Sequence, residues 1–229
     1  NLLFSLMGPL VQYLLFTQTK GFPNWNIDQI ILFQGILLFT IGLRNTLFGN
    51  SRSQFIRLIR NGEFDSFLLK PFPPIALLLA TSFNIDGIGT LCAGIVVTIY
   101  SIIKLNLLVT VGQIGLFLLS VILGLLFIVA LDIIHCSLII LTVADGGING
   151  ILNAYLRFAE YPLEIYSGFL KTLFITFIPI TILVYYPTQI ILNRIDIKML
   201  YTSSGVFLFY GLSLLFWGTV LKKYTSAGG

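Results

Sequence analysis

The chain has 229 residues, of which 57% are apolar and only 10% are charged, and its formal net charge is +4. A mean hydropathy of +0.97 excludes an ordinary soluble domain, because so few polar side chains cannot cover so much apolar mass. The apolar runs are long and continuous, which predicts membrane-spanning helices, since each helical crossing needs about 20 apolar residues. The sequence therefore predicts an all-α integral membrane protein with one transmembrane domain over 1–229.

Six apolar runs predict six transmembrane helices. In chain order the expected ranges are 1–16, 28–48, 86–103, 109–136, 169–187 and 199–221. The first run lacks a basic leader and a cleavage site, so we expect a span rather than a signal peptide. The apolar run of the fourth span continues to residue 144, which predicts one long helix that projects into the cytoplasm. In the fifth span, Pro179 is expected to loosen the helix, and the YYP sequence at 185–187 is expected to end it at the outer surface.

The distribution of charge among the connections predicts the topology. Basic residues gather between the second and third spans and after the last span: Arg44, Arg52, Arg57, Arg60, Lys70, Lys222 and Lys223. By the positive-inside rule both regions lie in the cytoplasm, so the N- and C-termini are both expected there. Trp25 and Pro23, in the connection after the first span, are then expected to be anchors at the outer interface.

The stretch FIRLIRNGEFDSFLLKPFPP at 55–74 is predicted to form a compact amphipathic element rather than a flexible loop. A helix that begins at Ser53 and stops at Gly62 places Phe55, Ile56 and Ile59 on one face. The opposite face is expected to project Arg52, Arg57 and Arg60. A second turn at 63–69 ends where Pro71 forbids helix. Two interpretations follow: an interfacial helix whose arginines meet anionic lipid headgroups, or a docking surface for a cytoplasmic partner.

Three stretches resemble ABC-2-type transporter permeases of the small six-span subgroup. The sequence RNGEFDSFLLKPFPP is similar to a cytoplasmic R-x-G-x-x-D-x-x-L-L-x-P motif that follows the second span. The stretch at 158–192 is similar to a YP-x-x-I-Y element followed by a span with an internal proline and a YYP turn. The ending WGTVLKKYTSAGG resembles the family's small-residue Y-x-S-A-G ending.

This resemblance implies the permease half of an ATP-binding-cassette exporter in the plasma membrane of a prokaryote. Two such permeases, identical or homologous, pair in the membrane above two cytoplasmic ATPase subunits, which drive translocation by alternating access. ATP and Mg²⁺ then belong to the ATPase, and this chain is expected to hold no cofactor, no metal and no nucleic acid. In agreement, no GxxxxGK[ST] phosphate-binding sequence occurs in the chain, so we do not expect it to be an enzyme.

The resemblance also implies that the segment 51–74 is the coupling helix that seats in a groove of the ATPase. The positions that match the motif are Arg60, Gly62, Asp65, Leu68, Leu69 and Pro71. Their neighbours Arg57 and Glu63 are added because they lie on the same element. Four apolar side chains are expected to be the buried anchors of the docked interface: Phe55, Phe64, Phe67 and Leu68.

Four further residues are candidates for a substrate path or a polar interface. Asp132 and His135 lie three residues apart on one helix face, where they either share a proton or lie partly solvated at the end of an overlong helix. Tyr161 and Tyr166 flank the YPLEIY sequence, which by itself favours an amphipathic start to the fifth span. The resemblance implies a position near the cytoplasmic side of the translocation interface for these tyrosines.

Two other classes of function stay open. The first is an intramembrane lipid-modifying enzyme that uses Asp132 and His135 as an acid/base pair. The second is a secondary carrier independent of ATP, for which we would expect inverted repeats, and none is detectable. The single histidine of the chain has no second histidine or cysteine at ligand spacing, so neither a zinc site nor a catalytic triad is predicted.

Overall fold

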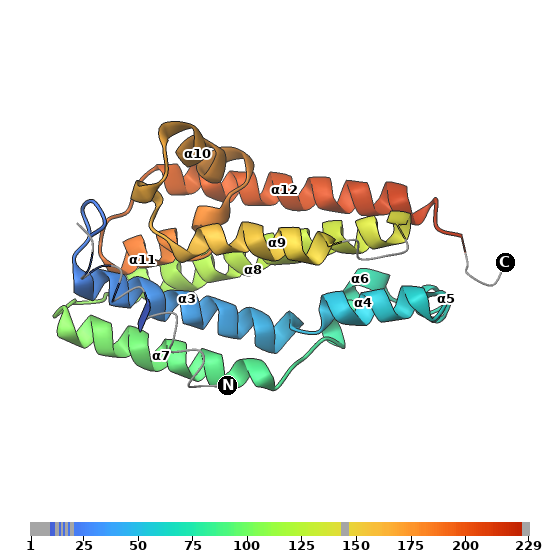
Figure 1. The fold of residues 1–229 in the computed structure, drawn as a ribbon, viewed down its shortest axis with the longest axis horizontal. Helices are drawn as coiled ribbons and strands as arrows, with labels where there is room; N and C mark the ends of the chain where they lie inside the picture. The colour runs from blue at the N-terminus through green and yellow to red at the C-terminus, as the bar shows by residue number, and fades with distance from the viewer. Residues whose placement is uncertain are drawn as a thin grey trace.

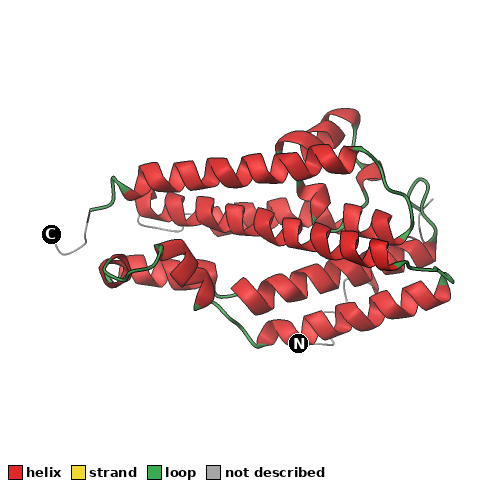
Figure 2. Ribbon diagram, turned by 180° about the vertical axis from the view of Figure 1, so that it is seen from behind, coloured by secondary structure: helices red, strands yellow, loops and turns green. Residues whose placement is uncertain are grey.

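A computed structural model describes residues 21–142 and 147–225, together with positions 10, 11, 14, 16 and 18. In these residues all regular structure is helical, and the long helices lie roughly parallel in an elongated bundle (Figure 1). The same arrangement seen from behind shows a separate group of short helices at one end of the bundle (Figure 2). The predicted span at 1–16 falls almost entirely outside the described residues.

Four long helices form the bundle. They are α3 (Ile27–Phe48), α7 (Asp86–Lys104), α8 (Val111–Thr142) and α12 (Lys198–Leu221). In the described part of the chain these four, α3 taken together with its continuation α4, are long and apolar enough to cross a membrane. Their bounds coincide with four of the predicted ranges, and α8 is one helix of 32 residues, as the long apolar run predicts.

Short helices make up the rest of the described chain. Between α3 and α7 lie α4 (Ser51–Arg60), α5 (Phe64–Leu68) and α6 (Pro74–Ala80). Between α8 and α12 lie α9 (Ile148–Leu156), η1 (Arg157–Glu160), η2 (Leu163–Ile165), α10 (Gly168–Thr172), η3 (Leu173–Phe177), η4 (Ile180–Ile182) and α11 (Tyr185–Ile191).

Helices α3 and α7 pack with their backbones in unusually close contact, and glycine makes this approach sterically possible. Gly35 and Gly42 of α3 alternate with Gly87 and Gly94 of α7, and each pair is spaced by seven residues. A Cβ at Gly42 would overlap the backbone of Leu91, and one at Gly94 would overlap the backbone of Phe39. Seven residues correspond to two helical turns, so the glycines of each helix share one face.

The prediction of a fifth span at 169–187 is wrong. Instead of one helix, this range contains α10, a π-helical turn, a break at Pro179 and a 3₁₀ turn. Proline lacks the N–H that a continuous helix needs and disfavours helical geometry in the preceding residue, and Ile178 accordingly has φ −130° and ψ 83°. The YYP sequence does not end a helix either, because Tyr185 begins α11.

The chain travels along the bundle earlier than predicted, through α9 and η1 at 148–160. These two elements contact α8 and α3, respectively (Figure 1). Thirteen helical residues extend roughly 20 Å, less than the ~30 Å of a bilayer core. Irregular backbone at membrane depth is tolerated only where protein groups satisfy its hydrogen bonds.

Side chains supply those hydrogen bonds along 158–190. Tyr155 donates to the carbonyl of Ile178 at 3.3 Å, and Thr40 of α3 donates to that of Leu183 at 3.1 Å. The other such donors are Gln34 to Glu160, Gln113 to Ile190, Tyr166 to Phe158 and Thr181 to Phe174. Polar residues of α3 and α8 therefore stabilise a segment that does not form its own continuous ladder.

The close α3–α7 contact can be tested by adding one methyl group. We expect Gly94→Ala to lower stability by about 1–3 kcal/mol, because overpacking forces the two backbones apart. The matched control is Gly89→Ala on the same helix, where a Cβ meets nothing within 4 Å. Alanine also favours helix over glycine, so the control should be neutral or slightly stabilising. Thermal unfolding in detergent measures both, and equal melting temperatures would contradict the glycine contact.

Candidate functional site

The α4–α6 layer, residues 51–80, lies at one end of the bundle and is almost continuous with α3. Gly49 and Asn50 both keep right-handed helical backbone angles, so α3 leads into α4 with little interruption. Two bonds tie the α3–α4 junction to the end of α6: the backbone bond from Asn50 to Ser82, 3.3 Å, and the side-chain bond from Gln54 to Thr81, 3.1 Å. Movement of this layer is therefore transmitted to α3, to which the segment before α7 is tied by the bond from the N–H of Asn84 to the carbonyl of Thr46, 2.9 Å.

Gly62 stops α4, as the sequence predicts, and the geometry explains why glycine is needed there. Its φ is +70°, in the left-handed region that side chains other than glycine rarely adopt. Its N–H bonds to the carbonyl of Ile59, and the N–H of Glu63 bonds to that of Leu58. This is the Schellman pattern of helix termination. The helix itself begins at Ser51, two residues before the predicted Ser53.

The inner face of the layer packs against α8 and α12 through an aromatic cluster. The Phe64 ring centroid lies 5.2 Å from that of Phe55 and 5.2 Å from that of Tyr224. Phe55 also contacts Trp217 of α12. Phe55, Phe64 and Phe67 are all buried within the chain. The expectation that these three anchor a docked partner is therefore wrong, because this protein's own helices already cover them.

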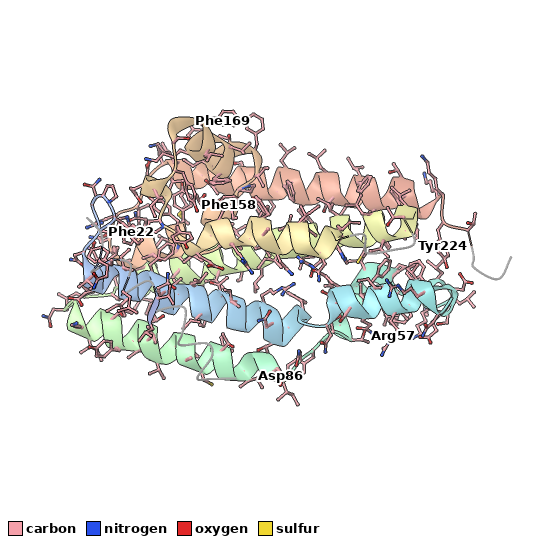
Figure 3. The ribbon with its side chains drawn as sticks, in the orientation of Figure 1. Phe22, Arg57, Asp86, Phe158, Phe169 and Tyr224 are labelled. Carbon is pink, nitrogen blue, oxygen red and sulfur yellow. The ribbon has the colours of Figure 1, made fainter. Side chains whose placement is uncertain are left out.

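The outer face and tip of the layer carry the motif positions. Arg57, Arg60, Glu63, Leu68, Leu69 and Pro71 are exposed, and Gly62 and Asp65 are half-buried. Leu69 is 87% exposed, and its neighbour Phe72 is 64% exposed. Sequence reasoning missed Phe72 as part of this surface. Figure 3 labels Arg57 on α4, away from the bundle.

Arg52 does not project with Arg57 and Arg60, contrary to the prediction. It is only 4% exposed, and its Nε donates to Asp132 of α8 at 2.6 Å. Helical spacing explains the error: residues 52, 55, 56 and 59 are i, i+3, i+4 and i+7, so Arg52 belongs to the buried face. A buried charge needs a countercharge, and an aspartate in the middle of the apolar run of α8 could have identified one.

Asp132 is the centre of a buried polar cluster. Besides Arg52 it accepts a hydrogen bond from the Ser51 hydroxyl at 2.8 Å, and Arg44 of α3 lies 3.9 Å away. The Arg52 guanidinium also donates to Asn149 and Asn153 of α9, at 3.1 and 3.0 Å. The cluster thus joins α3, α4, α8 and α9.

His135 is fully buried one turn along α8 from Asp132. Asp132 is only 2% exposed, and its carboxylate is engaged by Arg52 and Ser51. Neither residue lines the clefts described below. Asp132 therefore lies in a packed ionic joint with Arg52 and Ser51, and His135 is enclosed next to it on α8.

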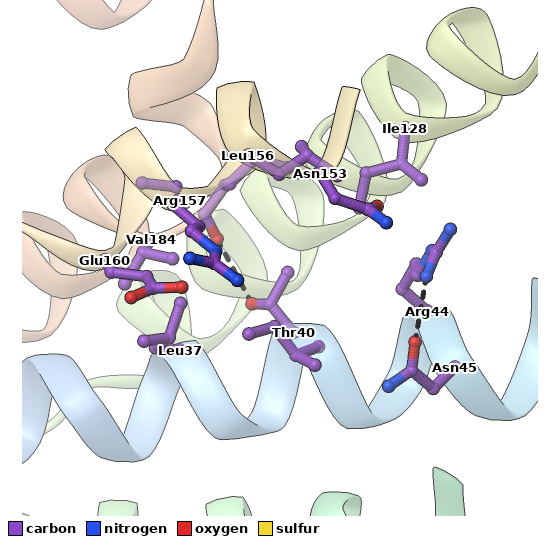
Figure 4. Close-up of a pocket in the computed structure, with 13 residues that line it drawn as sticks. Leu37, Thr40, Arg44, Asn45, Ile128, Asn153, Leu156, Arg157, Glu160 and Val184 are labelled. Atoms are coloured by element: carbon purple, nitrogen blue, oxygen red, sulfur yellow. Dashed lines mark hydrogen bonds between the residues drawn. The ribbon is translucent and has the colours of Figure 1, made fainter. Parts of the chain in front are cut away.

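A cleft of about 250 Å³ opens beside this joint, between α3 and α9–η1. Arg44 and Asn45 line it at one end, and Arg157 and Glu160 line it at the other (Figure 4). Most of the remaining wall is apolar, formed by Leu37, Ile41, Ile128, Leu156, Ala159, Leu183 and Val184. The sequence analysis missed Arg157 and Glu160, because it expected no span at 148–160.

Tyr161 and Tyr166 lie farther along the bundle and line a second hollow of about 380 Å³ that also includes Arg157. The resemblance implied the cytoplasmic side for them, but the intervening Glu164 accepts hydrogen bonds from Trp25 at 2.8 Å and Tyr185 at 2.7 Å. Trp25 directly precedes α3, at the end opposite the α4–α6 layer (Figure 1). A cytoplasmic placement of these tyrosines and one of the α4–α6 layer therefore cannot both hold, because α9 and η1 carry the chain along the bundle first.

The apolar helices define the class of the protein, a multi-pass membrane protein. A model of the ABC-2 family transporter proteins matches residues 2–228, nearly the whole chain. The chain therefore belongs to the ABC-2 transporter family, as the three sequence motifs indicated. No curated protein and no solved structure matches the chain.

The ionic joint predicts a double-mutant signature. Arg52→Met leaves a buried carboxylate without its close partner, so we expect a loss of about 3–5 kcal/mol. Adding Asp132→Leu should recover most of that loss, because replacing both members of a buried pair by apolar groups is often neutral. Thermal unfolding of the purified variants measures this, with exposed Arg60→Met as the control that should change little. Additive losses for the two substitutions would contradict direct coupling.

Proposed function

We propose that this chain is the permease subunit of an ATP-driven exporter and that the tip of the α4–α6 layer docks a cytoplasmic ATPase. A second permease, identical or homologous, completes the membrane part, and two ATPase subunits bind beneath. The substrate then crosses by alternating access, while ATP and Mg²⁺ bind to the ATPase and this chain has no catalytic role. Membership of the ABC-2 family supports this assignment at the level of class.

The observation that carries the proposal is that the α4–α6 layer has a buried inner face and an exposed outer tip. Its inner face is fixed to the bundle by buried aromatic rings and by the Arg52–Asp132 pair. Its outer tip exposes apolar Leu69 and Phe72 among charged side chains. Exposed apolar side chains with charges around them are typical of a protein interface. Transmission of ATPase closure requires a stiff joint, and this layer provides one.

The proposed topology keeps six crossings but changes the fifth. The first, predicted at 1–16, lies almost entirely outside the described residues, and the fifth is formed by α9 and η1 with the irregular residues that follow. The α4–α6 layer and the C-terminal end of α12 lie at the same end of the bundle (Figure 1), where the basic residues gather. By the positive-inside rule this end faces the cytoplasm of a prokaryotic cell, and both chain termini lie on that side.

Charge reversal at the tip tests the docking role. In Arg57→Glu/Arg60→Glu we expect the ATPase that co-purifies with the wild-type chain to be lost by about tenfold or more, since truncating or reversing interface charges costs a few kcal/mol. Leu69→Asp should do the same by removing an apolar anchor. The measurement is the amount of Walker-motif ATPase retained on the tagged permease, with ATP hydrolysis by the complex as a second readout.

The control is Lys198→Glu, an equally exposed basic residue at the start of α12, at the opposite end of the bundle. It should retain the ATPase at the wild-type level. Melting temperatures of all variants should match the wild type, because the substituted side chains are exposed. Full retention by the reversed tip variants, or a wild-type chain that retains no ATPase, refutes the docking role.

A further inference from the structure

Arg44 and Arg157 line the α3–α9 cleft, and the acidic side chains near them do not neutralise both. Asp132 forms its close ion pair with Arg52 at 2.6 Å, and Arg44 lies beyond it at 3.9 Å. The Nε of Arg44 is enclosed and has no hydrogen-bond partner among the described residues. Arg44 therefore shares a carboxylate that Arg52 already neutralises.

Arg157 lies at the other end of the same cleft, beside Glu160 (Figure 4). In the described part of the chain no hydrogen bond or ion pair within 4.0 Å engages its guanidinium, although Glu160 is close enough to interact electrostatically. With Arg52 and Asp132 neutralising each other, the cleft contains two cations and one anion. It therefore has an excess of one positive charge.

An excess positive charge at this depth needs an explanation. The cleft lies along the part of α3 from Leu37 to Asn45, a length of about 12 Å. The whole of α3 is about as long as the membrane core is thick. Charged residues within transmembrane segments are costly and by default indicate a substrate path or a bound ligand. Guanidinium groups bind carboxylate and phosphate oxygens in a planar, bidentate manner.

The remaining walls indicate what accompanies the anionic group. Apart from its polar ends the cleft is mostly hydrocarbon, and its volume of about 250 Å³ is smaller than that of most ligand pockets, about 300–1,000 Å³. A headgroup and the first part of one chain fit this space better than two acyl chains do. The cleft favours an amphiphile over a free inorganic anion, since an apolar wall gains nothing from the latter.

The second hollow extends this site toward the other end of the bundle. Arg157 lines both hollows, and the second adds Phe158, Tyr161, Ile165 and Tyr166. Both follow α9 and η1, so a headgroup that leaves Arg44 meets Arg157 next and then the two tyrosines. The predicted path residues Tyr161 and Tyr166 thus lie beyond Arg157 on one surface.

We infer that the α3–α9 cleft binds a single-chain amphiphile with an anionic carboxylate or phosphate headgroup, for which Arg44 at one end and Arg157 at the other are successive binding positions. The apolar wall binds the start of the hydrocarbon chain, and Glu160 sets an upper limit on affinity by repulsion. The inference rests on the proposed function only for treating this ligand as the transported substrate. Binding itself requires no ATPase.

Photolabelling tests the inference on the full chain in zwitterionic nanodiscs. The probes are a diazirine-bearing long-chain carboxylate, an alkyl phosphate, a phosphocholine and an alkyl trimethylammonium of equal chain length. We expect the two anionic probes to label peptides of 37–45 or 153–166, and excess unlabelled anionic amphiphile to suppress this labelling. A preference between carboxylate and phosphate would identify the headgroup. Equal labelling by the cationic or zwitterionic probe overturns the inference.

Substitutions of the charged cleft residues test whether the headgroup of the ligand is anionic. Arg44→Gln/Arg157→Gln should weaken anionic labelling by about tenfold, because charge-assisted hydrogen bonds are the strong ones. Glu160→Gln should strengthen it, whereas the opposite pattern would indicate a cationic ligand and refute the inference. Arg44→Lys/Arg157→Lys keeps the charge but not the bidentate geometry, so it should label more than the glutamine variant and less than the wild type, which separates lost binding from misfolding. Lys198→Gln, far from the cleft, should behave as wild type.

The same preparations distinguish this inference from the proposed function. We expect Arg44→Gln/Arg157→Gln to retain the ATPase, because neither side chain belongs to the exposed tip of the α4–α6 layer. A wild-type chain that labels with anionic probes but retains no ATPase supports the binding site and refutes the permease assignment. A wild-type chain that retains the ATPase but labels equally with probes of every charge supports the permease assignment and refutes the binding site.

Discussion

A buried ion pair between Arg52 of α4 and Asp132 of α8 joins the helical layer outside the bundle to the bundle itself. Two charges removed from water are stable only when each has partners for its remaining donors or acceptors. Here Ser51 and the asparagines of α9 supply partners for Asp132 and for Nη1 of Arg52, at 2.8 to 3.1 Å, whereas Nη2 of Arg52 has none among the described residues. Because the partners come from α4, α8 and α9, displacement of any one of these helices exposes a buried charge, and the three are constrained to move together.

This constraint makes the α4–α6 layer a stiff part of the structure. On one side α3 leads into α4 almost without interruption, and α3 is packed backbone to backbone with α7 through glycines. On the other side the aromatic cluster of Phe55, Phe64 and Trp217 fixes the layer to α12. A force applied at Leu69 or Arg60 is therefore distributed over the long helices of the described bundle. A flexible loop with the same charges would dissipate that force locally.

Much of this arrangement follows from sequence patterns, and the failures have physical causes. Long apolar runs located α3, α7, α8 and α12, and the Gly62 stop followed from the need for a positive φ. Hydropathy failed for 148–192, because there the backbone is satisfied by donors from other helices, such as Thr40 and Gln113, which a local pattern does not reveal. Arg52 was predicted to be exposed because arginine is charged, although its helical spacing places it on the buried face. Its partner Asp132 lies 80 residues away in sequence, so no local pattern reveals the pair.

The irregular course of 148–192 also explains how charged residues can lie beside apolar helices. A continuous fifth helix at 169–187 would contribute apolar and aromatic side chains, three threonines and a single charged residue, Lys171, to the bundle. The observed course instead places Asn153, Arg157 and Glu160 against α3, where Arg44 faces them. Asn149 and Asn153 of α9, which accept hydrogen bonds from Arg52, and Arg157 of the cleft follow one another at intervals of about one helical turn. The ionic joint and the cleft therefore share a residue, because Asn153 is hydrogen-bonded to Arg52 and also lines the cleft.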